Sequence, residues 1–258
     1  MAQSLEAKVE ALEKEVKRLQ RAQDYCEIQN VFALHEYYHH LPNEEVEMIF
    51  AKKQPDVCFA QNWGVWIGLD HVKKYYRSQT REELQKQLDT IRKYNPDIPD
   101  DIKYANVGSG IFHMLTTPII EVAEDGQTAK GMWYTPGASN GFNEREKKWQ
   151  AGWMFEKYAV DFIKEDGKWK IWHFNVFCDF GCSYEKSWVD AAEEQRLNPR
   201  PPMEMPLNLP PDLPGPGFKE YSTRRVWQMP KPPEPYRTFS ETFSYGPGKM
   251  PLVAGSLD

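Results

Sequence analysis

The chain has few cysteines, no long apolar run and no basic segment, and each absence excludes a class of protein. The four cysteines are irregularly spaced, so a disulfide framework is not expected. No apolar stretch approaches the roughly 18 residues that a membrane helix needs, and the N-terminal segment is already charged. Lys and Arg number 32 against 38 Asp and Glu, and this net charge of −6 argues against a nucleic-acid surface. We therefore expect a cytoplasmic protein without membrane or nucleic-acid partners.

The glycine motifs that bind phosphates are also missing. There is no G-x-G-x-x-G and no P-loop, and the isolated Gly108-Ser109-Gly110 is typical of a loop. We therefore expect no nucleotide cofactor. What the chain does contain is 40% hydrophobic and 14% aromatic residues, enough for one sizeable core or two small ones.

The first residues follow the spacing of a coiled coil. Apolar side chains alternate steps of four and three, at Leu5, Val9, Leu12, Val16 and Leu19. Three heptads are too few for a stable free coil, but they suffice for a helix that packs on a partner subunit or back on its own domain. We treat residues 1–21 as a heptad helix extension. The helical pattern then continues to Leu41, before Pro42.

The middle of the chain predicts helices first and strands afterwards. We expect a short helix over 43–53, apolar runs at 57–61 and 64–67, an interrupted helix from 69 to about 94, and a loop over 95–110. Segments 111–122, 128–134, 149–164 and 168–180 are rich in β-branched and aromatic residues, with Asp-Gly turns between two pairs of them. This order predicts an α+β fold with a curved, mainly antiparallel sheet.

The C-terminal part differs in composition. Residues 198–258 hold 14 of the 20 prolines, so regular helix or sheet is not expected there. Because the segment also carries aromatic residues, we expect it to wrap along the domain surface; a wholly disordered tail is the alternative. The expected units are thus 1–21, an α+β barrel domain at 22–190, and a proline-rich arm at 191–258.

Histidine is the most informative residue type, since only six are present. His35 and His39 are one turn apart and continue an apolar stripe, so both are predicted to point inward. Read literally, His35 to His39 spell the H-E-x-x-H pattern of zinc proteases, but the extended motif is absent. A metal held by some of His35, His39, His113 and His173 in another fold remains a separate hypothesis.

Two strand segments resemble a known family. They are His113-Met114-Leu115-Thr116-Thr117-Pro118-Ile119-Ile120-Glu121-Val122 and Tyr158-Ala159-Val160-Asp161-Phe162-Ile163-Lys164. Over about residues 22–180 the chain is similar to the SnoaL-like branch of the nuclear-transport-factor-two-like superfamily, which includes scytalone dehydratase, bile-acid dehydratase and diarylpropane lyase. The resemblance implies a cone-shaped sheet wrapped around the N-terminal helices and a deep pocket. It also implies proton-transfer chemistry that needs no cofactor.

The resemblance also implies roles for single residues. His113 stands where several members have a histidine that acts as the general base. The carboxylate partner of that histidine falls on His40, and a tyrosine of the family falls on His35. An Asp–His pair charges and orients the base, whereas a His–His pair cannot do so electrostatically. This departure favours either a different acid/base assignment or metal binding.

Strand periodicity suggests which further side chains complete the site. Asp161 can restore a carboxylate, although it can equally be a sheet aspartate that faces a neighbouring strand or solvent. If Trp169 and Ile171 face the core, His173 and Asn175 reach into the pocket and can hold a substrate oxygen; the alternative is that they lie on the outer face. Further substrate contacts are expected from aromatic side chains, at Tyr38, Trp66, Tyr134 and Phe177.

The leading prediction is a cofactor-independent acid/base lyase that acts on a small hydrophobic, aromatic molecule by dehydration or by retro-aldol cleavage such as loss of formaldehyde. Its catalytic residues would be His113, His40, His35 and Asp161. The alternatives are a metal-dependent enzyme that uses the histidine cluster and a non-catalytic binding or assembly module. The heptads and apolar strands favour a homo-oligomer in all three cases.

Overall fold

The computed structural model describes residues 4–38, 46–76, 79–199, 209–248 and 251–254. Its helices are α1 (Leu5–Tyr38), α2 (Val46–Ile49), α3 (Leu69–Tyr76), α4 (Arg81–Tyr94) and α5 (Trp188–Leu197), with 3-10 turns at Ile102–Tyr104 and Phe239–Glu241. Its strands are β1 (Cys58–Gln61), β2 (Gly64–Ile67), β3 (Gly110–His113), β4 (Thr116–Val122), β5 (Thr128–Asn143), β6 (Lys148–Glu165), β7 (Lys168–Ser183), β8 (Leu213–Pro214), β9 (Met229–Pro230) and β10 (Leu252–Ala254).

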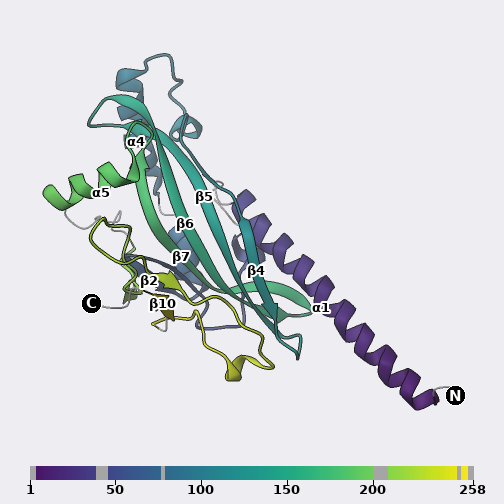
Figure 1. The fold of residues 1–258 in the computed structure, drawn as a ribbon. Helices are drawn as coiled ribbons and strands as arrows, with labels where there is room; N and C mark the ends of the chain where they lie inside the picture. Colours follow the sequence, from purple (N-terminus) through teal and green to yellow (C-terminus); the bar gives the residue numbers. More distant parts are fainter. Residues whose placement is uncertain (1–3, 39–45, 77–78, 200–208, 249–250, 255–258) are drawn as a thin grey trace.

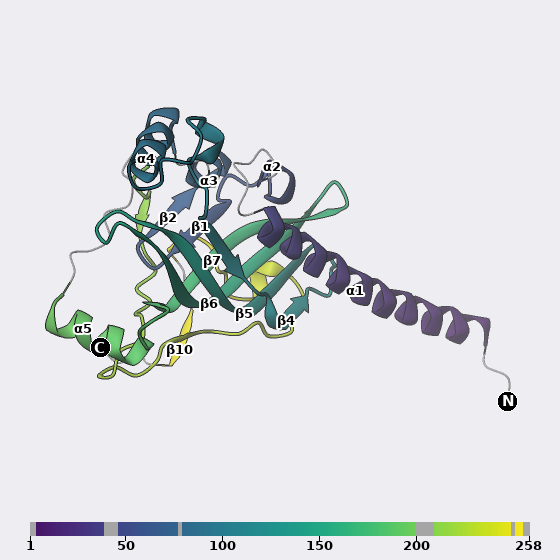
Figure 2. The same ribbon diagram turned by 90° about the horizontal axis from the view of Figure 1, so that it is seen from above.

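Strands β1 to β8 form one large, curved sheet that is not closed into a barrel (Figure 1), and β9 and β10 pair in a second, two-stranded sheet. The order of the large sheet is β3-β5-β6-β7-β1-β2-β8, and β4 also pairs with β5. The β1–β7 pairing is parallel and the other described pairings in this sheet are antiparallel. Figure 2 shows α1 to α4 toward one side of the sheet, and α5 with most of the C-terminal segment toward the other. The expected mixed α+β fold with N-terminal helices and a curved sheet is confirmed.

The core lies between the second half of α1 and the concave face of the sheet. Phe32 is its centre: the side chain is fully buried and its ring lies 4.4–5.9 Å from four aromatic rings of the sheet, those of Trp133, Tyr158, Phe162 and Phe174. Aromatic pairs at these separations contribute about 0.5–1.5 kcal/mol each beyond the area that they bury. The inward stripe of α1 therefore fixes the helix across the sheet.

The strands differ from the prediction around residues 111–143, and the short strands β8, β9 and β10 lie in the proline-rich segment, where no regular sheet was expected. Segment 111–122 is divided into β3 and β4, and β5 continues beyond residue 134 to Asn143. Pro136 lies in β5 between two paired residues: Tyr134 pairs with the first residue of β4, and Gly137 pairs with the last residue of β3. A proline without an N–H is tolerated at such a break in the ladder, so it does not end the strand.

The helix boundaries also differ locally. Of the helix predicted over 43–53, residues 43–45 lie outside the described ranges. The described part, α2, ends at Ile49, because Phe50 forms a bridge with Ile171 and the chain turns into the sheet there. The predicted interruption between 69 and 94 falls before Thr80, whose side chain caps α4 in a capping box with Glu83. The boundary expected after residue 190 lies inside α5, which was not predicted.

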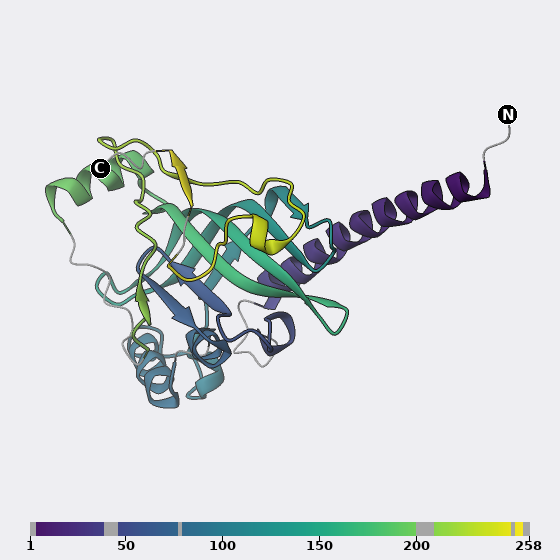
Figure 3. The same ribbon diagram turned by 90° about the horizontal axis from the view of Figure 1, so that it is seen from below.

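The segment after α5 covers the convex face of the sheet, as Figure 3 shows. We call residues 209–248 the C-terminal arm. The arm adds β8 to the sheet edge and inserts the side chains of Phe218 and Tyr245 into a second apolar cluster with Phe177. The backbone N–H of Tyr245 donates to Asp161 over 2.8 Å, and Asn175 donates to the Tyr245 carbonyl over 2.6 Å. These contacts tie the arm to β6 and β7.

Candidate active site

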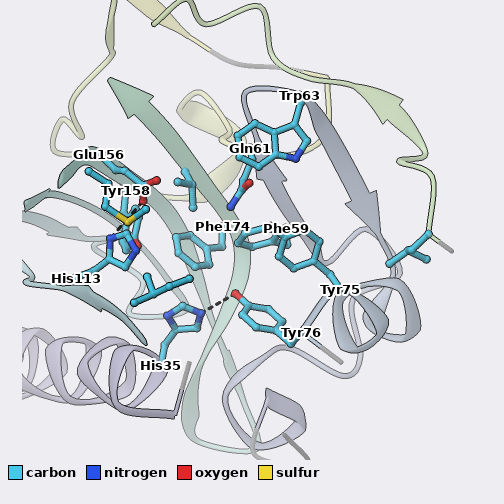
Figure 4. A pocket seen from close by; sticks show the side chains of 14 residues that line it. His35, Phe59, Gln61, Trp63, Tyr75, Tyr76, His113, Glu156, Tyr158 and Phe174 are labelled. Atoms are coloured by element: carbon cyan, nitrogen blue, oxygen red, sulfur yellow. Dashed lines mark hydrogen bonds and ion pairs between the residues drawn. The ribbon is translucent and has the colours of Figure 1, made fainter. Parts of the chain in front are cut away.

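A cavity of about 360 Å³ lies between the concave face of the sheet, the end of α1 and α3 (Figure 4). This volume is within the range of small-molecule sites. Most of the wall is apolar or aromatic, and the lining residues are His35, Phe59, Gln61, Trp63, Tyr75, Tyr76, Ile111, His113, Met154, Glu156, Tyr158, Phe174, Val176 and Leu209. The cavity wall thus combines aromatic rings with three separate polar groups.

The first polar group is a histidine beside a carboxyl group. His113 ends β3 and Glu156 lies on β6; Nδ1 of His113 is 3.4 Å from Oε2 of Glu156, and both side chains are buried. Burial is the main cause that raises the pKa of Glu156 to about 8, against a smaller opposing effect of its hydrogen bond with Tyr158. Near neutral pH the carboxyl group is therefore mainly protonated and can donate a proton.

The second polar group is built on His35. Its Nε2 lies 2.7 Å from the hydroxyl of Tyr76 and its Nδ1 lies 2.9 Å from Oε1 of Glu36. Burial lowers the pKa of His35 to about 3, so the imidazole is neutral. With the ring proton on Nδ1, which faces the Glu36 carboxyl group, Nε2 accepts a hydrogen bond from the Tyr76 hydroxyl. His35 therefore orients the Tyr76 hydroxyl.

The third polar group lies at the β1–β2 turn, at the other end of the cavity in Figure 4. Oε1 of Gln61 and Nε1 of Trp63 are buried, and neither finds a hydrogen-bond partner among the described residues. Asn62 between them is held in place: its Nδ2 donates to the carbonyl of Cys178 over 2.9 Å, and its Oδ1 accepts from the Cys178 N–H over 3.2 Å. A Cβ on Gly215 would lie 1.9 Å from the Asn62 carbonyl oxygen, so the arm packs tightly against this turn.

The structure brings together only part of the predicted site. His35 and His113 line the cavity, and His40 lies outside the described residues. Trp66 is fully buried, and its indole N–H donates to the carbonyl of Leu209 over 3.1 Å. Tyr38 is half-buried in the last turn of α1, with its ring 6.0 Å from that of Tyr37. Neither Trp66 nor Tyr38 is among the lining residues.

The remaining predicted residues lie on the convex face, under or beside the arm: Asp161, His173, Asn175, Tyr134 and Phe177. For His173 and Asn175 the reason is a β-bulge. Trp169 and Ile171 do face the core, but the register shifts so that Trp172 is left without a partner between two paired residues. The extra residue inverts the alternation. The expectation that His173 and Asn175 reach into the pocket is therefore corrected.

Asp161 takes part in a buried network instead of joining His113. Its carboxylate lies 2.6 Å from Nζ of Lys130 and 2.8 Å from Nδ1 of His173, and the Asp161 and Lys130 side chains are fully buried. Burial opposes the charge on His173, but hydrogen bonds to Asp161 and Asp56 outweigh it and raise the pKa of His173. Four aromatic rings of the arm lie within 5.8 Å of Lys130, at Tyr236, Phe239, Phe243 and Tyr245. The network secures the arm.

The predicted four-histidine metal cluster is not assembled among the described residues. His35 and His113 lie on the concave side and His173 on the convex side, while His39 lies outside the described ranges. In the part of the chain that the structure describes, no three His, Cys, Asp or Glu side chains are grouped to hold a metal ion.

None of the described helices is both long and apolar enough to cross a membrane.

Sequence reasoning missed Glu156, as it missed the polar groups of Tyr76, Gln61 and Trp63. Val160 and Phe162 lie in the core, on the face of β6 opposite Asp161, and the same alternation carried backwards puts Tyr158 and Glu156 on that inner face. The pairing of Tyr158 with Val176 and of Val160 with Phe174 keeps this register up to Glu156. A glutamate at an inward-facing position of a long strand was the feature of the sequence that could have predicted this site residue.

The chain is similar to a known domain family and to several solved structures. A model of the SnoaL-like domain matches residues 20–175. A candidate scytalone dehydratase from Novosphingobium aromaticivorans has 14% sequence identity over 66% of this chain and 93% of that one, with a TM-score of 0.44. An NTF2-like protein with a cystatin-like fold from the same organism has 15% identity over 65% and 89%, with a TM-score of 0.44. A type 2 hexachlorocyclohexane dehydrochlorinase has 15% identity over 64% and 92%, with a TM-score of 0.42. No curated protein sequence matches the chain.

Proposed function

The chain belongs to the SnoaL-like domain family, and on that premise we propose that it is a cofactor-independent lyase that breaks a C–O or C–C bond in a small aromatic molecule by acid/base catalysis. The observation that carries the proposal is the His113–Glu156 pair in a buried, aromatic-lined cavity. Paired titratable groups in such a cavity are characteristic of catalytic sites.

The two groups have complementary parts in the reaction. His113 acts as the general base, through its Nε2, because its Nδ1 faces Glu156. Glu156 acts as the general acid, because its raised pKa keeps it mainly protonated at neutral pH. Glu156 thereby supplies the carboxyl group that was expected from Asp161. His40 stays in the proposal as a further partner of His113.

Both expected reactions balance with this assignment. In a dehydration, His113 removes a proton from the carbon next to a carbonyl, the C–O bond on the neighbouring carbon breaks, and Glu156 protonates the departing hydroxide to give water and an alkene. In a retro-aldol cleavage, His113 removes the proton of a β-hydroxyl group, the C–C bond breaks, and Glu156 protonates the resulting enolate. Each turnover leaves a protonated His113 and an ionised Glu156, and proton return restores the pair.

The rest of the cavity supports an aromatic substrate. Phe59, Tyr75 and Phe174 present ring faces and edges to the space between the polar groups in Figure 4. The Tyr76 hydroxyl, oriented by His35, can accept a hydrogen bond from a substrate hydroxyl. Gln61 and Trp63 offer one acceptor and one donor, and a phenolic hydroxyl can satisfy both.

One compound tests both reactions. 3-Hydroxy-1-phenylpropan-1-one gives phenyl vinyl ketone and water on dehydration, and acetophenone and formaldehyde on retro-aldol cleavage. We expect the protein to accelerate one of these routes, and His113→Gln to abolish the acceleration without loss of folding. His71→Gln is the matched control, because His71 lies at the surface, paired with Asp212. Equal rates for His113→Gln and the unchanged protein would remove His113 from the mechanism.

A further inference from the structure

The first part of α1 leaves the body of the protein. Figures 1 and 2 show the helix projecting past the sheet, and the first buried side chain along it is that of Asp24. The heptad side chains point to solvent: Leu5 is 77% exposed and Leu12 65% exposed. Among the described residues, none covers this face, so the possibility that the helix packs back on its own domain is not realised.

We propose that this exposed face pairs with the same face of a second copy of the chain in a parallel, two-stranded coiled coil. Val9 and Val16 occupy the a positions of the heptads, and Leu5, Leu12 and Leu19 occupy the d positions. A β-branched residue at a together with Leu at d is the combination that favours parallel pairs of helices over larger bundles.

The flanking charges fit the same arrangement. In a parallel coil the g position of one helix faces the next e position of the other. Lys8 is at g and Glu13 is the following e, so two Lys8–Glu13 attractions form across the interface. Glu15, at the next g, faces the neutral Gln20 and is already paired with Arg18 in its own helix. In an antiparallel coil the e positions face each other and so do the g positions, so Glu13 would meet Glu13 while Lys8 would meet Glu15, which Arg18 of its own helix already pairs.

The folded domain makes so short a coil feasible. An isolated helix of three heptads is marginal, because its nucleation is unfavourable. Here the second half of α1 is fixed by buried Ile28, Phe32 and His35, and the exposed half continues the same helix. The helix is therefore formed before association, which lowers the entropy cost of pairing.

The mass of the full chain in solution tests the interface. At micromolar concentration we expect twice the chain mass of 30.2 kDa by light scattering. Leu12→Lys combined with Val16→Lys should halve the measured mass. The control, Ala7→Lys combined with Ala11→Lys, adds the same charge at the f and c positions and should leave the mass unchanged. A monomeric unchanged protein, or a mass that the Leu12/Val16 variant does not alter, would overturn the proposal.

The orientation has its own test. With Cys26→Ser to remove the exposed native thiol, Leu5→Cys should form a disulfide-linked dimer with oxidised glutathione, which is reduced as the two thiols join. Lys14→Cys, at an outer f position, should not. Lys8→Glu and Glu13→Lys should each raise the dimer dissociation constant several-fold, and the double variant should restore it. Equal cross-linking at Leu5 and Lys14, or no restoration, would contradict parallel pairing.

Discussion

Nδ1 of His113 lies 3.4 Å from Oε2 of Glu156, and the two side chains are 5% and 9% exposed. The contact joins the end of β3 to an inward position of β6, across the edge of a cavity that is otherwise mainly aromatic. A buried carboxyl group beside an imidazole provides a proton donor and a proton acceptor in one place. The buried Lys130–Asp161 pair, in contrast, lies on the opposite, convex face of the sheet.

Replacing Glu156 by Gln should abolish acid catalysis but preserve the cavity. The amide has nearly the same shape and cannot release a proton, so kcat on 3-hydroxy-1-phenylpropan-1-one should fall by about 10²–10⁴. Circular dichroism and the unfolding midpoint check that the fold is kept. A loss of less than about threefold would show that Glu156 is not the acid.

The activity should also depend on pH in a specific direction. Because the pKa of Glu156 is raised to about 8, its acid form is present below that pH and disappears above it. We expect kcat/KM of the unchanged protein to fall as the pH rises through about 8. A pH profile without that alkaline fall would disagree with the assignment.

Stability should follow the same titration. The carboxyl group of Glu156 ionises near its ordinary pKa of 4.5 in the unfolded chain but only near 8 in the folded one, so between these values the folded state binds more protons. The free energy of unfolding therefore decreases as the pH rises through this window. Glu156→Gln removes this contribution, so urea unfolding at pH 6 and pH 8.5 should show a smaller decrease in the variant. Equal decreases in both proteins would mean that Glu156 titrates normally.

The Gln61–Trp63 group should discriminate hydroxylated from plain aromatic rings. We expect 4-methylphenol to bind more tightly than toluene in calorimetry, by about two- to tenfold for one or two hydrogen bonds. Gln61→Met and Trp63→Phe should remove most of this preference while toluene binding stays unchanged. An unaltered preference in both variants would show that the hydroxyl binds elsewhere.

The buried Lys130–Asp161 pair should matter for stability alone. Lys130→Met leaves the fully buried carboxylate of Asp161 without its ammonium partner, which typically costs about 3–5 kcal/mol. Lys53→Met breaks an exposed, solvent-screened pair with Asp166 and should leave the unfolding midpoint nearly unchanged. Below its unfolding temperature the Lys130 variant should keep kcat. Loss of kcat in a folded Lys130→Met protein would place Asp161 in the chemistry.

The sequence was sufficient for the fold where periodicity is strong and local. The inward stripe of α1 and the Asp-Gly turns specify the helices-first order and the antiparallel hairpins of the sheet. The sequence was insufficient where the pairing of strands determines where a strand ends. Pro136 and Gly137 read as strand breakers, yet they lie inside β5, because the junction of β3 and β4 lies opposite them. Such a junction depends on a neighbouring strand, so it cannot be predicted from the hydrophobic pattern of β5 itself.

The candidate site also shows where prediction from the sequence fails. His35 was predicted to point inward from the spacing of its helix and His113 was predicted from the family resemblance, and both line the cavity. One unpaired residue, Trp172, was enough to turn His173 and Asn175 to the other face, since strand alternation has a period of two. Glu156, on a regular stretch of β6, followed the alternation and could have been found. A bulge cannot be read from one strand, because the partner's register creates it.

The central claim is that the His113–Glu156 pair moves a proton to and from the carbon atom next to a carbonyl group in this cavity: His113 removes it in a dehydration, and Glu156 delivers it in a retro-aldol cleavage. The most direct measurement is deuterium exchange into the methyl group of acetophenone in D2O, followed by proton NMR, because it records that step without cleavage of a C–O or C–C bond. We predict exchange faster than in protein-free buffer, lost when His113→Gln and Glu156→Gln are combined and retained in His71→Gln. Exchange that persists in the combined variant, or no exchange above buffer with the unchanged protein, would contradict the account.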